Sequence, residues 1–285
     1  MTQPTIGILH PGAMGISVAA SAQASGCTVY WVGNGRSPHT YARAQAHNLQ
    51  DAGTLAHLCA TCRIILSICP PHAAEQVASD VIANGFTGLF VDGNAIAPQR
   101  AQHIGQMVTT AGAAFVDGGI IGGPAWQVGE TWLYLSGERA DEVAACFVDG
   151  MLETAVIGPQ IGKASALKMC YAAYTKGTTA LLSAILATAE QLNVRTELEN
   201  EWSRDGSDFA SHTQNRVRRV TAKAWRFAGE MEEIAATFEQ AGLPGGFHLA
   251  ANEIYQRMAH FKDTADTPPL AAVLSSLRPT NHTTT

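Results

Sequence analysis

The 285-residue sequence has little charge and lacks an apolar run long enough to cross a bilayer. Its most apolar stretch, Gly177 to Ala189, is shorter than the roughly 20 residues that a membrane helix needs. Charged residues make up 15% of the chain and its net charge is −6, which argues against a nucleic-acid-binding surface. The short basic cluster of Arg216, Arg218 and Arg219 is flanked by acidic stretches. We therefore expect a soluble globular protein without a nucleic-acid or membrane partner.

Targeting and metal patterns are lacking as well. The N-terminus shows no basic leader and no apolar signal region, so we expect a cytoplasmic protein whose six cysteines are reduced. Cys59 and Cys62 form a CxxC pair, but no second pair stands at zinc-ligand spacing. We expect no metal site, and a redox or metal role for this pair is the weaker alternative. Neither HExxH nor GxSxG occurs, which argues against a zincin or a serine hydrolase.

The chain is long enough for two domains, and its pattern changes near residue 160. Before that point short apolar strands alternate with helices, which predicts an α/β fold with a doubly wound, mostly parallel sheet. Strands are expected at Thr5–Leu9, Thr28–Val32, Arg63–Ile68, Leu89–Val91, Ala114–Val116, Trp132–Ser136 and Thr154–Ile157, and helices at Tyr41–His47, Gly53–Cys59, His72–Asn84 and Glu138–Met151.

The rest of the chain is organised around the stretch Ile161–Leu192. It predicts about nine turns of helix, apolar nearly all round and therefore buried. Lys168 is conspicuous there, because a buried ammonium must pair, reach water or lose its proton. Tyr171 and Thr175 follow it on one helical face. Two interpretations stay open: an acid/base residue at a domain cleft, or a lysine that extends to the surface.

After this helix the sequence predicts an all-α region with a flexible end. His212 and His248 lie on helix faces, where a histidine is more often structural. The expected helices are Glu197–Trp202, Asp208–Arg219, Thr221–Ala241 and Phe247–Phe261; the expected domains are 1–160 (cofactor-binding), 161–262 (all-α, substrate and dimerisation) and 263–285 (a Pro- and Thr-rich flexible tail).

A glycine-containing turn follows the first expected strand and opens a helix, which is the context of a dinucleotide fingerprint. In this turn Gly12 would let the backbone approach a pyrophosphate, and Gly15 would allow close packing of helix on strand. The helix N-terminus would supply N–H groups to the phosphates. His10 stands where the first glycine of GxGxxG is usual. The predicted cofactor-binding residues of the turn are His10, Pro11, Gly12, Ala13, Met14 and Gly15.

The end of the second strand indicates which dinucleotide binds. NAD-binding proteins place an acidic residue there for the ribose 2′-hydroxyl, but none occurs between Gly15 and Asp51. Arg36 offers a planar cationic fork, with Asn34 and Ser37 as hydrogen-bond partners, which suits a 2′-phosphate. We therefore expect NADP(H) in preference to NAD(H). The alternative is a turn with a solvated arginine.

Other glycine-rich turns follow strands at the edge where open α/β sheets bind ligands. Gly122 and Gly123 would present N–H groups to a small anion such as a carboxylate. The alternative is a purely structural loop.

Several separated motifs together resemble the β-hydroxyacid dehydrogenase superfamily, which includes 3-hydroxyisobutyrate dehydrogenase, 6-phosphogluconate dehydrogenase and the imine reductases. The likeness spans about Thr5 to Met258 and is greatest to a phosphogluconate-dehydrogenase-like branch, judging by KMCYAAYTKG at 168–177. The other motifs are HPGAMG at 10–15, SICPP at 67–71, VDGNAIAPQ at 91–99, VDGGIIGGP at 116–124 and GKASALKM at 162–169.

The resemblance implies a Rossmann domain joined by a long interdomain helix to an all-α domain, and a homodimer built through the helices. It implies that Lys168 exchanges a proton with a small-molecule substrate while nicotinamide C4 exchanges a hydride. Asn94 and the pair Gly122–Gly123 would line the nicotinamide and the substrate carboxylate. Cys69 and Pro70, in SICPP, join the predicted cofactor site.

The chain departs from the family pattern at three positions. Ala172 replaces an asparagine four residues after the lysine, and Tyr171 is predicted to supply the missing catalytic hydrogen bond. Ile121, assigned to the substrate site, replaces a serine, and Glu230 falls where a later lysine is usual. These changes put the 3-hydroxy acid substrate in question.

Three functions follow from these patterns. The first is an NADP-dependent oxidoreductase acting on a small hydroxy acid or its keto partner. The second is an imine reductase or reductive aminase, with an aromatic pocket using Trp126, Trp225 or Phe247. The third is an NADPH-binding sensor without turnover.

Overall fold

The computed structural model describes residues 4–262, 264 and 266–278. It divides into two compact units, the first ending at Met169 and the second beginning at Cys170. The division falls inside helix α7 (Lys163–Ala172), further along the chain than the boundary that the sequence predicts after residue 160. Buried apolar side chains occur in both units.

The first unit contains an eight-stranded sheet in the order β3-β2-β1-β4-β5-β6-β7-β8. All neighbouring strands pair in parallel except β6 and β7, which are antiparallel. The prediction of a doubly wound, mostly parallel sheet is therefore confirmed. The strands are β1 Thr5–Ile8, β2 Thr28–Trp31, β3 Gln50–Asp51, β4 Ile64–Ser67, β5 Leu89–Asp92, β6 Ala114–Ile121, β7 Trp132–Ser136 and β8 Glu153–Val156.

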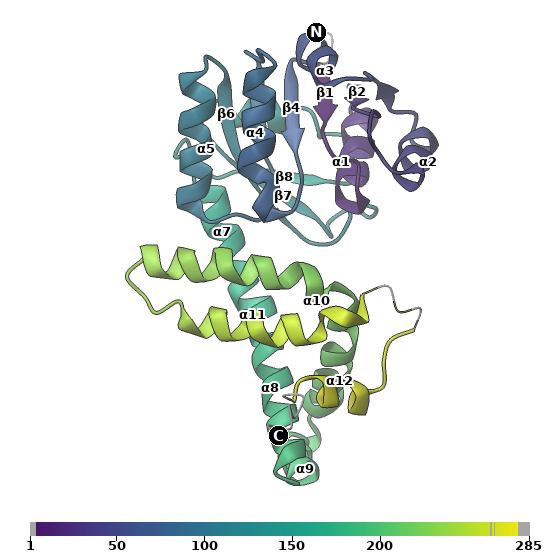
Figure 1. The fold of residues 1–285 in the computed structure, drawn as a ribbon, viewed down its shortest axis with the longest axis vertical. Helices are drawn as coiled ribbons and strands as arrows, with labels where there is room; N and C mark the ends of the chain where they lie inside the picture. Colours follow the sequence, from purple (N-terminus) through teal and green to yellow (C-terminus); the bar gives the residue numbers. More distant parts are fainter. Residues whose placement is uncertain (1–3, 263, 265, 279–285) are drawn as a thin grey trace, which may run out of the picture. The chain divides into compact units, whose positions relative to one another are not determined.

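Helices cover both faces of this sheet, because strands apolar on both sides must be buried on both. One buried cluster joins the sheet to α1, α2 and α6, and a second joins it to α3, α4 and α5. Figure 1 shows α4 and α5 side by side on one face. The helical elements are α1 Ala13–Ala24, α2 Pro38–Ala46, α3 Leu55–Thr61, η1 Pro71–Ala73, α4 Ala74–Ala83, α5 Pro98–Thr110 and α6 Ala140–Ala144.

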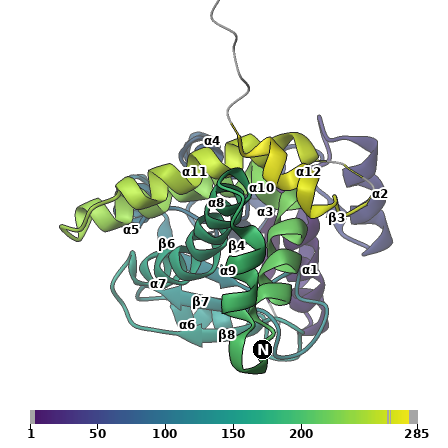
Figure 2. The ribbon, with the colours of Figure 1, turned by 90° about the horizontal axis from the view of Figure 1, so that it is seen from below.

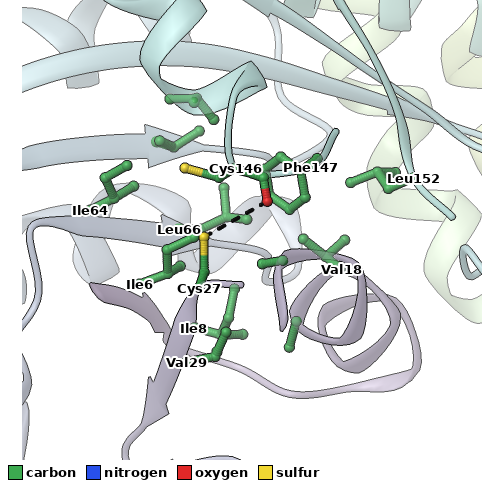
Figure 3. Packing of buried hydrophobic residues seen from close by; sticks show 14 of the residues in the cluster. Ile6, Ile8, Val18, Cys27, Val29, Ile64, Leu66, Cys146, Phe147 and Leu152 are labelled. Carbon is green, nitrogen blue, oxygen red and sulfur yellow. Dashed lines mark hydrogen bonds between the residues drawn. The ribbon is translucent and has the colours of Figure 1, made fainter. Parts of the chain in front are cut away.

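Figure 3 shows the first cluster, in which two cysteines take part as small apolar residues. The Cys27 Sγ lies 3.9 Å from the Cys146 carbonyl oxygen, among Ile6, Ile64 and Leu66. Burial raises the pKa of Cys146 to about 12, so its thiol stays protonated and unreactive.

Two expectations for this unit are wrong in extent, and one strand was not expected. The strand predicted to end at Val116 runs to Ile121, because its glycines let neighbouring backbone come close: a Cβ at Gly118 would lie 3.0 Å from the Asp92 oxygen. The helix predicted over 138–151 is only α6, Ala140–Ala144. The two-residue strand β3 was not expected, since it is too short to leave a pattern.

The stretch from residue 161 to 192 is helical nearly throughout, as predicted, but it is not a single α-helix. It comprises α7, the π-helical turn η2 (Ala173–Gly177) and α8 (Thr178–Gln191). Among the described residues, no helix combines the length and the hydropathy needed to span a membrane.

The second unit is all-α. Helix α10 is one continuous helix of 32 residues where the sequence analysis expected two, at 208–219 and 221–241. The β-branched pair Val220–Thr221 does not break it, because β-branched residues lower helix propensity only slightly. The Thr221 hydroxyl donates to the Arg218 carbonyl within the helix. Figures 1 and 2 both show α10 and α11 side by side. The elements are α9 Arg195–Trp202, η3 Arg204–Gly206, α10 Phe209–Gln240, α11 Gly246–Met258, η4 Ala259–Phe261 and α12 Leu270–Ser276.

The expectation of a flexible tail from residue 263 is wrong where the chain is described. Helix α12 forms there because Val273, Leu274 and Leu277 are buried in the second unit. The rest of that prediction, at residues 263, 265 and 279–285, lies outside the described residues.

Candidate active site

The turn between β1 and α1 carries the residues predicted to bind a pyrophosphate. Gly15 is held against the chain before it: a Cβ there would lie 2.2 Å from the His10 carbonyl oxygen. Gly12 is exposed, and no described heavy atom lies within 4 Å of where its Cβ would stand. In the described chain, α1 has no side-chain cap and no acidic residue in its first turn. Its first N–H groups and positive dipole end therefore suit an anion.

Two arginines bind carbonyl groups that flank this turn. Arg36 Nη2 donates to the Leu9 oxygen and Arg43 Nη1 donates to the Pro11 oxygen, each at 3.0 Å. Arg36 Nε is buried and has no hydrogen-bond partner among the described atoms. The Arg36 guanidinium is thus placed beside the nucleotide turn, with its Nη2 bonded to the Leu9 carbonyl and its Nε unused.

His10 lies next to Arg36 and is half-buried. Burial, and then the charge of Arg36, lower the pKa of His10 to about 4. The imidazole is therefore neutral at pH 7, so it adds no charge to a phosphate site. Its Nδ1 is buried and, within the described structure, has no partner.

Asp51, at the end of β3, is a residue that the sequence analysis left out of the site. Its Oδ1 accepts from the Gly33 and Gly53 N–H groups at 2.9 and 2.8 Å, and its Oδ2 accepts from the Tyr41 hydroxyl at 3.2 Å. Asp51 therefore lies beside the end of β2, where a ribose-binding acid would be expected, but both its oxygens already bind protein donors. A two-residue strand gives no sequence signal that would have brought it there.

Asn34 and Ser37 flank Arg36 and are both exposed. The Ser37 hydroxyl caps α2 by accepting from the Thr40 N–H at 3.3 Å. The Asn34 N–H donates to the Gly53 oxygen at 3.3 Å. The structure thus brings together the three residues predicted to hold a 2′-phosphate, although Ser37 also has a structural role.

Asn94 joins the carboxyl ends of β4 and β5, which lie along the same edge of the sheet. This residue is only 2% exposed. Asn94 Oδ1 accepts from the Cys69 N–H at 2.5 Å, and Nδ2 donates to the Ser67 hydroxyl and to Asp92 Oδ2 at 3.2 and 3.0 Å. Asn94 therefore fixes the two strand ends, and its side chain is fully engaged within the protein. Pro70, the next predicted residue, is exposed.

Burial favours the protonated forms of two groups beside Asn94. Burial raises the pKa of Asp92 to about 7, although hydrogen bonds from Asn94 act against it. Burial also raises the pKa of the Cys69 thiol to about 11, which argues against a thiolate there at pH 7.

Asp117, on β6, fixes the start of the helix that carries Lys168. Its carboxylate accepts from the Gly162 and Ser165 N–H groups, both at 3.0 Å, and from the Ser165 hydroxyl at 2.6 Å. The Ser136 hydroxyl of β7 donates to the same carboxylate at 3.0 Å. An acid from a strand thus caps the N-terminus of α7, satisfying its orphan N–H groups.

From this cap α7 crosses β6 toward the strand's carboxyl end. A Cβ at Gly119 would lie 2.6 Å from the Ala164 oxygen and 3.1 Å from the Lys168 Cβ, so the helix rests directly on that glycine. Lys168 is half-buried. The sequence analysis predicted Lys168 but did not foresee that Asp117 and Gly119 would position it.

Ile121 ends β6, and Gly122 and Gly123 open the exposed loop that follows. Gly122 has φ +126°, and a Cβ there would lie 2.4 Å from the Glu130 oxygen. No described heavy atom lies within 4 Å of a Cβ built at Gly123. Gly122 is therefore required by the loop, and the backbone at Gly123 is open to a ligand.

Other predicted residues belong to the second unit. Tyr171 is exposed and accepts a hydrogen bond at its carbonyl from the Thr175 hydroxyl at 3.0 Å. Ala172 is 1% exposed. Glu230 forms an ion pair with Lys176, which also lies over the Phe227 ring at 4.3 Å from its centroid.

The three aromatic residues proposed for an imine pocket are all exposed. Trp126, in the first unit, stacks on His47 with ring centroids 5.2 Å apart. Trp225 and Phe247 lie in the second unit, on α10 and α11. No group of three or more potential metal-ligating side chains occurs in the described part of the chain.

Two protein families match the chain. Residues 5–145 match the NAD-binding domain of 6-phosphogluconate dehydrogenase, and residues 189–258 match a domain of unknown function, DUF1932. A search among curated proteins found no match.

Solved structures share the whole fold. A conserved hypothetical protein from Sinorhizobium meliloti 1021 is 22% identical, with a TM-score of 0.70 and 96% of each chain covered. 3-Hydroxyisobutyrate dehydrogenase from Mycobacterium tuberculosis is 19% identical, with a TM-score of 0.72 over 97% of this chain and 99% of that one. A reductive aminase from Aspergillus terreus, in complex with NADPH and ethyl levulinate, is 14% identical, with a TM-score of 0.55 over 97% and 100%. At these identities the likeness is one of fold.

Proposed function

Because the chain belongs to the β-hydroxyacid dehydrogenase superfamily of NAD(P)-dependent oxidoreductases, we propose that it interconverts a small hydroxy acid and its keto partner with NADP(H). Lys168 is the acid/base residue in this proposal. The observation that supports it best is the seating of α7 on Gly119, which places Lys168 near the carboxyl end of β6. That edge of the sheet also carries the nucleotide turn.

The residues of the first unit fit a dinucleotide. Gly12 leaves open space for a phosphate, and the uncapped start of α1 offers N–H groups to it. Gly15 lets the helix approach the strand closely enough to present them. When bound, the nicotinamide would supply the carbon that gives or takes the hydride.

The preference for NADP(H) rests on the charges at the end of β2. Arg36 keeps an unused buried donor beside the turn, and Asn34 is exposed next to it. Asp51 is the acid nearest to the NAD-specific position, but its oxygens accept from Gly33, Gly53 and Tyr41. A 2′-phosphate would therefore gain charge-assisted hydrogen bonds, whereas a 2′-hydroxyl would find its usual acceptor engaged.

Lys168 would hold the proton that the substrate oxygen exchanges. In the reductive direction the Nζ ammonium donates to the developing alkoxide, and in the oxidative direction the neutral amine accepts from the hydroxyl. The open backbone at Gly123 would orient the substrate carboxylate through its N–H group. Tyr171 stays a predicted helper of the lysine.

Reduction of a C=N bond is the second candidate, and Ala172 and Ile121 favour it. Ala172 is buried and, being alanine, offers no hydrogen-bonding group where the family pattern has an asparagine. Ile121 stands where that pattern has a serine at the substrate position. An imine needs fewer hydrogen bonds from the protein than a hydroxy acid does. Activity on cyclic imines with none on hydroxy or keto acids would select this candidate.

The test compares Lys168→Ala with Lys163→Ala, a change at an exposed lysine on the same helix. Oxidation and reduction are assayed over hydroxy acids, keto acids and cyclic imines, and NADPH affinity is measured by calorimetry. We expect Lys168→Ala to lower kcat by about 10²–10⁴, the usual worth of a general acid or base, with NADPH affinity kept. Near-normal turnover in that variant would remove Lys168 from the mechanism. NADPH binding without turnover on any compound would instead support the sensor hypothesis.

A further inference from the structure

The face of the sheet that carries α7 continues beyond β6 onto β7. Asp117 pairs with Ser136, and hydrogen bonds join both to α7: the Ala164 N–H donates to the Ser136 hydroxyl at 3.1 Å. Since side chains alternate between faces along a strand, every second residue from this pair also faces α7. On β6 these residues are Gly119 and Ile121.

Their partners on β7 are aromatic. Gly119 pairs with Tyr134 and Ile121 pairs with Trp132, so both rings belong to the face of α7. Ile121, Trp132 and Tyr134 form what we call the aromatic wall. The rings of Trp132 and Tyr134 are stacked, with centroids 6.1 Å apart and planes 23° apart.

The aromatic wall lies next to Lys168 along the strands. The cap at Asp117 and Ser136 marks the start of α7, and Lys168 lies over the following pair, Gly119 and Tyr134. The next pair, Ile121 and Trp132, is at the carboxyl end of β6. Opposite residues in an antiparallel pair have Cβ atoms about 4.5–5.5 Å apart. Tyr134, the partner of Gly119, is therefore close enough to Lys168 for the two side chains to border the same space.

The wall is open and apolar. Trp132 is 37% exposed and Tyr134 is half-buried. The adjoining strand β8 places Ala155 beside Tyr134 and Glu153 beside Trp132. Aromatic faces favour contact with apolar and planar groups. The Glu153 carboxylate, beside Trp132 on the side away from β6, disfavours a second anionic group on a substrate that already carries a carboxylate.

We propose that the aromatic wall is a specificity-determining surface that receives an apolar or aryl substituent carried by the reacting carbon of the substrate. This proposal rests on the proposed function and on Lys168 as its acid/base residue. It names a substrate class: monocarboxylic hydroxy acids, or imines, that bear an apolar group, in preference to phosphorylated or sugar acids. Ile121, in the position of a hydrogen-bonding serine, belongs to the same surface.

The experiment uses matched substrate pairs on the intact chain. 3-Hydroxypropionate is compared with 3-hydroxy-3-phenylpropionate, and 1-pyrroline with 2-phenyl-1-pyrroline. The variants are Trp132→Ala and Tyr134→Ala, with Trp202→Ala, whose ring packs edge-on against Phe209 in the second unit, as the matched control. Trp132→Leu is included because it keeps an apolar side chain on the strand.

We expect wild type to favour the phenyl member of a pair by at least about tenfold in kcat/KM, the discrimination of an apolar pocket for a larger group. Trp132→Ala and Tyr134→Ala should remove most of that ratio, Trp132→Leu should retain part of it, and Trp202→Ala should leave it unchanged. Equal ratios in wild type, Trp132→Ala and Tyr134→Ala overturn the proposal, as does a wild-type preference for the unsubstituted compound.

A binding measurement separates this proposal from the proposed function. Calorimetry of 3-phenylpropionate and propionate is carried out on protein saturated with NADPH. If no compound is turned over, the proposed function fails, and the wall is judged by calorimetry alone. Tighter binding of the phenyl compound that Trp132→Ala abolishes supports the wall, and equal binding of both compounds to wild type refutes it.

Discussion

Gly119→Ala tests whether the contact between α7 and β6 positions Lys168. The added Cβ would lie 2.6 Å from the Ala164 oxygen, whereas ordinary contacts begin at 3.4 Å, so α7 must move by about 0.8 Å. The oxygen belongs to the helix backbone and cannot rotate away. The Lys168 Cβ, at 3.1 Å, is displaced in the same direction.

The magnitude follows from two general costs. Overpacking a filled interior destabilises by about 1–3 kcal/mol, and a misplacement of about 1 Å at a reacting group costs roughly 10²-fold in rate. We therefore expect Gly119→Ala to shift the urea midpoint downward and to lower kcat by about 10–10², while NADPH affinity changes little.

Gly229→Ala is the matched control. Gly229 lies inside α10, and no described heavy atom is within 4 Å of a Cβ built there. Replacing a helical glycine by alanine stabilises by about 0.5–1 kcal/mol. Urea titration followed by circular dichroism, together with steady-state kinetics, measures both variants. A Gly119→Ala enzyme with normal kcat and an unchanged midpoint would refute the argument that this contact holds the lysine in place.

Two further predictions concern charges of the first unit. Because burial raises the pKa of Asp92 from 3.8 to about 7, the folded state holds its proton where the unfolded state has lost it, and stability falls as pH rises between these values. Asp92→Asn should flatten that fall in urea titrations at pH 4 to 7, and an unchanged slope would contradict it. Arg36→Ala should weaken NADPH binding by about 10- to 100-fold, the worth of one charge-assisted hydrogen bond, and leave NADH binding nearly unchanged. Equal losses for the two cofactors, measured by calorimetry, would show that Arg36 only supports the turn through Leu9.

The sequence predicts the fold well because its signals are local. Strands such as β4 are short apolar runs bounded by polar turns, and the turn at His10–Gly15 has the spacing of a nucleotide loop. The full length of α10 was not predicted because Val220 and Thr221 weaken a helix only slightly, and the burial of Thr221 in the second unit is not visible in the sequence. Helix α12 is likewise too short to be predicted from its own sequence, and it is stabilised by contacts with α8, α10 and α11, which are distant in the chain.

The site is less predictable, since its supporting residues come from different strands. Lys168 stands out in sequence as a charge on an apolar helix, but Asp117, Gly119 and Tyr134 give no such signal. They matter because the register between β6 and β7 puts them beneath and beside α7. Antiparallel pairing of these strands could not be inferred from a pattern that is parallel everywhere else.

Asp51 lies at the position where an NAD-binding protein carries its ribose-binding acid. The sequence analysis inferred NADP(H) from the lack of an acid near the end of β2, yet β3 brings Asp51 to that place. The proposed preference for a 2′-phosphate therefore depends on the carboxylate, which binds two N–H groups and the Tyr41 hydroxyl. In Tyr41→Phe the Asp51 Oδ2 loses its partner while Oδ1 keeps both of its N–H donors. If the proposed preference is correct, the gap between NADPH and NADH affinity should therefore narrow, and an unchanged gap, measured by calorimetry, would contradict it. The hydrogen bonds that the acid already makes are visible only in the three-dimensional structure.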